Sequence, residues 1–228
     1  MSNGTQQSAY GQLTPEDVTS DLDMMNFVVR QVLNQVDTVK VVKVIAVHPG
    51  SGSPPAGGTV DVQPLVNQID GNGFPTSHGT VFGLPYTRMQ AGAWAIIADP
   101  AVGDMGLIVC ADRDSSSVIA NKAQANPGSR RKHNIADGFY IGAALNAAPT
   151  SYFQLNSDGT FKIADSKGNV LQTSGSGFSL TGNVVVTGNF SASGTISDTS
   201  GAGLSLTTHT HSGVTTGGGT SGPPTPGT

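Results

Sequence analysis

The chain of 228 residues has a formal net charge of -4, only 11% charged residues and as many as 31 glycines. The near-neutral balance argues against a nucleic-acid partner, which requires a basic face. It also disfavours intrinsic disorder, which usually accompanies high net charge. A repetitive, mainly β structure with glycine at tight corners is therefore expected, with room for one large domain or two small ones.

Export by the general route and membrane anchoring are not expected. The first ten residues are polar and lack the apolar centre of a signal peptide, and no apolar run approaches the ~20 residues that span a bilayer. The single cysteine, Cys110, excludes an internal disulfide and fits assembly in a reducing cytoplasm. It lies in an apolar run and is predicted to be a small buried core residue.

The N-terminal segment, 1–37, is predicted to contain a helix. Thr14 is expected to be the N-cap and Pro15 the first helical residue, followed by two acids that would face the positive end of the helix dipole. Apolar residues then recur with mostly helical spacing from Leu22 to Val36. Because this stripe is broad, it is expected to pack on the next domain or on copies of itself near a symmetry axis.

Residues 38–114 are predicted to form an OB-fold barrel. Runs of β-branched residues predict strands at 39–47 and 59–66, joined into a hairpin by a turn rich in Pro and Gly. Further short strands are predicted at 80–84, 93–98 and 105–111. Five short strands over about 75 residues, separated by turn signals, are typical of a small barrel of this type.

The connecting segment, 115–149, is predicted to include a short helix within 115–126. The basic cluster at 130–133 is expected to be a solvated turn rather than a functional patch.

From 150 to 208, short strands alternate with polar turns, and glycine recurs every six to eight residues or so. Each strand could contribute only one or two apolar residues to an interior, so a single chain cannot bury a core in this way. Three chains wound round one axis can, with apolar residues inside and Ser and Thr outside. An intertwined trimeric β-helix is therefore predicted; the alternative, a flexible linker, is disfavoured by the regular alternation.

The candidate metal ligands are His209 and His211, in the predicted apex tip at 209–228. Residues two apart on a strand point to the same face, so each chain would present two imidazoles. Three chains would then supply six ring nitrogens, enough for an octahedral ion. Imidazole suits iron, zinc, copper and nickel, but six-fold coordination disfavours zinc. Because such a shell leaves no position open for substrate, a structural metal is predicted rather than a catalytic one.

The order of these segments resembles that of the central spike protein of contractile phage tails, the membrane-puncturing tip of the baseplate. The barrel end 96–114, with Gly103-Asp104-Met105-Gly106 and Asp112-Arg113-Asp114, is similar to the end of that family's OB domain. The Gly-punctuated region 150–206 and the His209-Thr210-His211 sequence before a Gly- and Pro-rich end follow in the family's order.

The resemblance implies a homotrimer whose OB-fold base attaches to the baseplate hub and tail tube proteins. It implies a β-helix shaft and an apex where His209 and His211 of three chains hold one iron ion per trimer. It also implies a passive role without catalytic residues, in which sheath contraction drives the spike through the host outer membrane. The protein would be assembled in the host cytoplasm and would lie at the tail baseplate tip of the virion.

Two other functions fit parts of the pattern. A trimeric receptor-binding tail fibre or adhesin would share the β shaft, but it should end in a larger head with exposed aromatic residues rather than a Gly- and Pro-rich tail. A metal-dependent enzyme would require an open coordination position and a further acid beside the histidines, and no such acid is evident. A non-enzymatic, structural protein is therefore expected.

Overall fold

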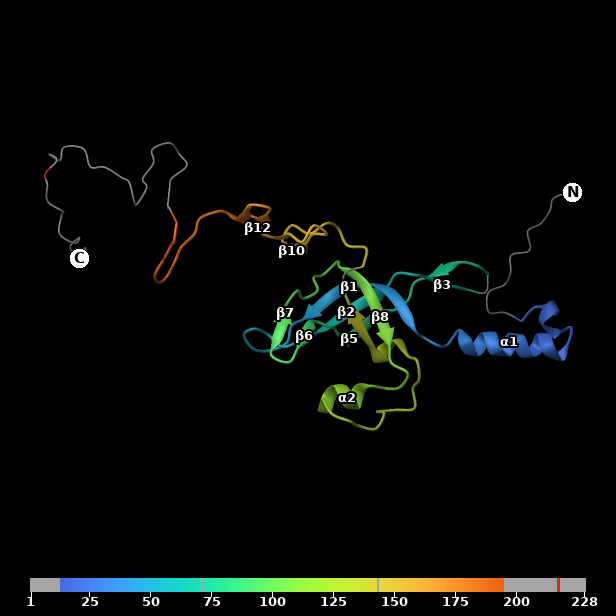
Figure 1. Ribbon diagram of the computed structural model, residues 1–228. Helices are drawn as coiled ribbons and strands as arrows, with labels where there is room; N and C mark the ends of the chain where they lie inside the picture. The colour runs from blue at the N-terminus through green and yellow to red at the C-terminus, as the bar shows by residue number, and fades with distance from the viewer. Residues whose placement is uncertain (1–12, 71, 143, 195–216, 218–228) are drawn as a thin grey trace, which may run out of the picture. The chain divides into compact units, whose positions relative to one another are not determined.

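The computed structural model describes residues 13–70, 72–142, 144–194 and 217. The chain divides into two compact units, Met1–Ala148 and Pro149–Thr228 (Figure 1). The described residues are mainly β, as predicted, with few helices. Within these residues, no helix combines the length and the apolar character needed to cross a membrane.

The predicted N-terminal helix is present, but it is broken near its start. Thr14 precedes a short 3-10 helix, η1 (Pro15–Val18), and donates to the Asp17 carboxylate from its backbone N–H at 2.9 Å and its hydroxyl at 2.8 Å. The α-helix α1 (Asp21–Leu33) begins only after Ser20, whose hydroxyl oxygen accepts the Asp23 N–H at 3.2 Å. Ser20 is thus a second N-cap, and it moves the helix start by six residues from the predicted one.

The first unit is built on a five-stranded antiparallel sheet with the order β5-β2-β1-β8-β9. Its strands are β1 (Val39–His48), β2 (Thr59–Pro64), β5 (Val81–Pro85), β8 (Met105–Cys110) and β9 (Gly138–Ile141). The predicted hairpin of the first two strands is confirmed. The last strand, β9, comes from the predicted connecting segment and was not foreseen.

Two small hairpins accompany this sheet. One joins β3 (Gln68–Ile69) to β4 (Pro75–Thr76), and the other joins β6 (Met89–Ala91) to β7 (Trp94–Ile96). The strand predicted at 93–98 therefore pairs within its own hairpin instead of joining the five-stranded sheet.

The five-stranded sheet curls around its core. A register shift between Val44 and Ala46 bends β1, and one parallel bridge joins Tyr86, next to β5, to Tyr140 on β9. Gly106 makes room for the Tyr140 ring, since a Cβ there would lie 2.6 Å from a ring carbon. The enclosed side chains are Val42, Val44, Val60, Val62, Val81, Leu84, Tyr86, Ile108 and Tyr140. Cys110, predicted to be buried, is only partly buried and packs against this core.

The segment between β8 and β9 contains the predicted short helix, α2 (Ser116–Asn121), and a 3-10 turn, η2 (Ile135–Asp137). Arg131 belongs to the cluster predicted to be a solvated turn, and it is exposed. Its guanidinium nevertheless contacts two buried carboxylates. Its guanidinium donates to Asp114 at 3.1 Å and to Asp137 at 2.8 Å. The hydroxyls of Ser116 and Ser129 also donate to Asp114, and with Arg131 they hold the pKa of Asp114 well below its usual range.

This cluster predicts a specific acid sensitivity. Because the pKa of Asp114 is lower in the folded chain than in the unfolded one, its contribution to stability is present at neutral pH. That contribution is lost as pH falls below the ordinary carboxyl value toward the folded pKa. Asp114→Asn should lower the melting temperature at pH 7. It should also make the melting temperature fall less steeply between about pH 4 and pH 2 than in the unsubstituted protein. Thermal unfolding of both proteins across this range measures the effect; parallel stability curves would contradict it.

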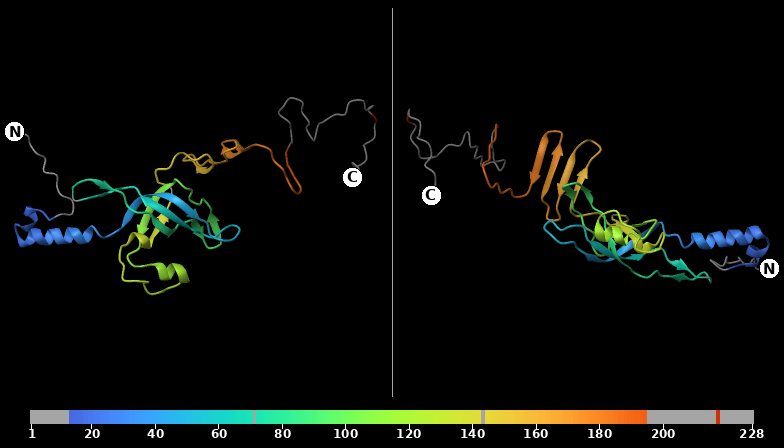
Figure 2. Two further views of the ribbon diagram at one scale, coloured as in Figure 1. Left: turned by 180° about the vertical axis from the view of Figure 1, so that it is seen from behind. Right: turned by 90° about the horizontal axis from the view of Figure 1, so that it is seen from below.

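The second unit is a four-stranded antiparallel sheet with the strands in chain order (Figure 2, right). Its strands are β10 (Tyr152–Leu155), β11 (Phe161–Ala164), β12 (Val170–Ser174) and β13 (Gly177–Thr181). The predicted alternation of short strands and polar turns is confirmed for 152–181. The described residues 183–194 form no strand, although the sequence predicted strands there. The intertwining of three such chains into a β-helix remains a prediction.

Tight local turns join the first three of these strands. Gly159 and Gly168 have φ values of +82° and +88°, a conformation that favours glycine. In each turn an aspartate closes the loop: Asp158 accepts the Thr160 N–H and Asp165 accepts the Asn169 N–H, both at 2.9 Å. The turns thus form from residues adjacent in sequence.

Candidate functional sites

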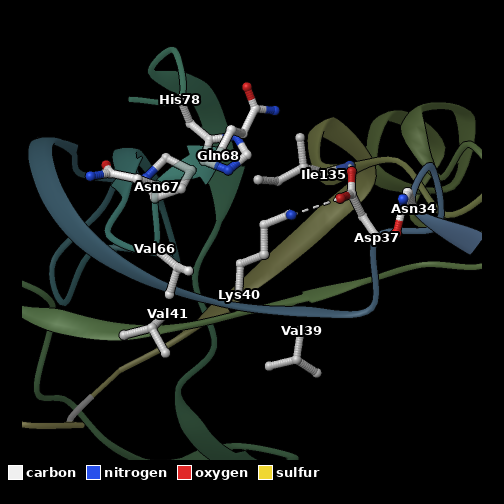
Figure 3. A pocket seen from close by; sticks show the side chains of 11 residues that line it. Asn34, Asp37, Val39, Lys40, Val41, Val66, Asn67, Gln68, His78 and Ile135 are labelled. Carbon is white, nitrogen blue, oxygen red and sulfur yellow. Dashed lines mark hydrogen bonds and ion pairs between the residues drawn. The ribbon is translucent and has the colours of Figure 1, made fainter. Parts of the chain in front are cut away.

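A pocket of about 540 Å³ opens beside the start of β1 (Figure 3). Lys40 Nζ pairs with Asp37 Oδ1 at 2.9 Å, and Asp37 Oδ2 accepts the Ile135 N–H at 3.0 Å. Asn67, Gln68 and His78 line the opposite side. The charged groups of this pocket therefore hold the junction between the N-terminal segment and the sheet, and they do not place a nucleophile beside a base.

The second unit presents an apolar face on its sheet. The strand register aligns Phe153, Ile163, Leu171 and Leu180 in one row across all four strands. A second row places Leu155 opposite Phe161 and Thr173 opposite Phe178. We call these residues, Thr173 excepted, the apolar sheet face; its members are Phe153, Leu155, Phe161, Ile163, Leu171, Phe178 and Leu180.

An aromatic row runs across the apolar sheet face. The Phe161 ring lies 6.3 Å from that of Phe153 and 6.0 Å from that of Phe178, both in tilted contacts. The opposite face has polar residues, among them Gln154, Lys162, Gln172, Ser179 and Thr181.

The apolar sheet face is open to solvent in the single chain. Leu155 and Phe178 are 73% and 77% exposed, and Phe153 and Leu180 are each more than half exposed. Exposed apolar patches of this continuity mark interaction surfaces, and a sheet that is apolar on one face must bury that face against another element. The sheet therefore requires a partner surface.

The predicted metal ligands, His209 and His211, lie outside the described residues. Among the residues that the structure does describe, no group of three or more His, Cys, Asp or Glu is close enough to hold a metal ion. Of the other histidines, His48 contacts a carboxylate, with its Nε2 2.9 Å from Asp61 Oδ2.

Comparison with known protein families gives a match near the C-terminus of the sequence. Residues 203–225 match the family described as the GpV Apex motif. The matched stretch includes His209 and His211 but covers only a small part of the sequence. It indicates a phage spike or needle protein, a structural component of the virion tail, and the motif is a metal-binding apex in spike proteins in general. Comparison with curated proteins gives no significant match.

Proposed function

We propose that this chain forms the central spike at the tip of a contractile phage tail baseplate, and that it pierces the host outer membrane when the sheath contracts. The observation that carries the proposal is the apex match at 203–225, which includes the two histidines singled out by their spacing. The spike acts as a homotrimer. It neither makes nor breaks covalent bonds of the host, and its role is mechanical.

The apolar sheet face supports the homotrimer. One chain leaves the row from Phe153 to Leu180 uncovered, whereas three copies around one axis turn three such faces inward and bury them together. The polar face, with Lys162 and Gln172, then remains in water. This sheet, 152–181, is the described part of the proposed shaft at 150–208.

The strand order of the first unit supports an OB-fold base. Sheet order β5-β2-β1-β8-β9 with a parallel bridge from Tyr86 to Tyr140 brings the two edge strands together, as the closure of a five-stranded barrel requires. This base attaches the spike to the baseplate hub and tail tube proteins.

His209 and His211 of the three chains provide six imidazoles for one iron ion at the apex. Neutral imidazole is the ligand form, so the metal should be released as the histidines protonate below about pH 6. The ion holds the apex segments of the three chains together at the place where the load is greatest. The role of the metal is therefore structural.

Metal analysis combined with light scattering on the purified full-length chain tests this proposal. A trimeric mass with about one iron ion per three chains is expected, because each chain supplies two of the six imidazoles. A monomer, or a full metal ion on every chain, would show that the proposed assembly is wrong.

A further inference from the structure

The helix α1 carries an apolar stripe that is exposed in the described chain. Leu22, Met25, Val29 and Val32 are spaced by three, four and three residues, and each is at least half exposed. Alternation of three and four residues is the spacing of the a and d positions of a coiled coil. No residue of α1 is buried in the described part of the chain, so the stripe requires an occupant.

We infer that the occupant is the same helix of two further copies, and that three α1 helices pack side by side as a short parallel coiled coil. The inference rests on the proposed homotrimer and adds a second contact to it, at the opposite end of the sequence from the apex. In this arrangement Leu22 and Val29 take a positions, and Met25 and Val32 take d positions.

The identity of these residues favours three helices over two. Val29 and Val32 place β-branched side chains at both a and d, which shifts a coiled coil from dimers toward trimers and higher states. Val28 and Leu33 lie at the flanking g and e positions and are also at least half exposed. They widen the apolar stripe beyond what a two-helix contact covers.

Charged residues of α1 do not occupy the a and d positions of the apolar stripe. Asp23 and Arg30 both lie at b positions, away from the stripe. Arg30 is also paired within its own chain, with one guanidinium nitrogen 2.9 Å from Asp17 Oδ1. Asp21, at the very start of the helix, is the one charged residue at an a, d, e or g position between 21 and 36.

The parallel arrangement follows from the anchored end of the segment. The Asp37 N–H donates to the His133 carbonyl at 2.8 Å, and the Asp37 carboxylate binds Lys40 and the Ile135 N–H. These contacts fix the point where the N-terminal segment leaves the sheet. A threefold axis relating the sheets therefore relates the three segments with the same direction.

The length of the stripe explains why the contact depends on the whole trimer. From Leu22 to Val32 it is only about 15 Å long at the helical rise of 1.5 Å per residue. Isolated helices this short are marginal in water. The shaft holds three copies together and raises the local concentration of the helices, so their association becomes intramolecular.

Site-specific cross-linking of the full-length protein tests the inference. In a Cys110→Ser background, Val29→Cys places one thiol per chain at a central a position, and Met24→Cys places a matched thiol at a c position on the far side of the same helix. A short bis-maleimide should link two chains of every three in the Val29→Cys protein. Met24→Cys should give several-fold fewer covalent pairs.

Light scattering of both variants separates the possible failures. If the protein is a trimer but Val29→Cys is cross-linked no more than Met24→Cys, the coiled coil is wrong. The stripe would then be assigned to another protein, and the proposed spike would be unaffected. A monomer would overturn both. A trimer with links confined to Val29→Cys is the result expected.

Discussion

Replacing His209 and His211 together by alanine is expected to abolish iron binding while the protein stays a trimer. The two histidines of each of the three chains supply all six proposed imidazoles, whereas the apolar sheet face holds the chains together without them. Metal content should fall from about one ion per trimer to background, which can be measured by elemental analysis of the protein after gel filtration. Light scattering on the same fractions gives the mass.

His78→Ala is the matched control, because His78 lies in the pocket beside β1 and has no part in the proposed apex. It should leave the iron content unchanged. Dissociation of the double variant into monomers would contradict the division of roles, since it would make the metal, rather than the shaft, the main link between chains.

Phe161→Asp is expected to prevent trimer formation. Phe161 lies at the centre of the aromatic row, in contact with Phe153 and Phe178. Loss of a buried phenylalanine alone costs about 3–5 kcal/mol per site. In the trimer the change is made three times, and it also brings three carboxylates together in an apolar interior. Analytical ultracentrifugation should show mainly monomer.

Gln172→Asp provides the control for charge alone. Gln172 lies on the polar face of the same sheet, opposite Lys162 in the strand register, where a carboxylate meets a favourable neighbour. This variant should remain trimeric. Equal dissociation of both variants would show that the apolar sheet face does not form the contact.

The strands of the first unit could be predicted where β-branched residues are dense, as in β1 and β2. The strand β9 was missed because Gly138–Ile141 is short and lies after a long irregular segment. Its one local signal is the aromatic pair Phe139-Tyr140 between glycines. The position of Tyr140 in the core depends on Gly106, which is distant in sequence and whose role appears only once the strands are paired.

Contacts of single charged residues were equally hard to foresee. Arg131 lies in an exposed turn, as expected, yet it also binds Asp114 and Asp137, one from each side in the sequence. Such a contact depends on how a loop closes, and composition does not contain that information. Ser20, by contrast, is a recognisable N-cap that the earlier Thr14-Pro15 signal masked.

The candidate apex shows the opposite case. His209 and His211 stand out by spacing alone, and the family match includes both. The apolar sheet face was foreseen as alternation, but its register was not, because pairing depends on turn lengths that place Phe153 opposite Ile163 and Leu171 opposite Leu180. The metal ligation and the trimer remain predictions that the experiments above decide.

The turns at Gly159 and Gly168 have a consequence for the order of folding. Each closes through hydrogen bonds between residues at most four apart, so each hairpin can form within microseconds and before any second chain arrives. The apolar sheet face, however, is covered only when chains meet, a bimolecular step. Assembly should therefore be limited by encounter: its rate should rise with protein concentration, and newly made chains should be vulnerable to aggregation until they find two others.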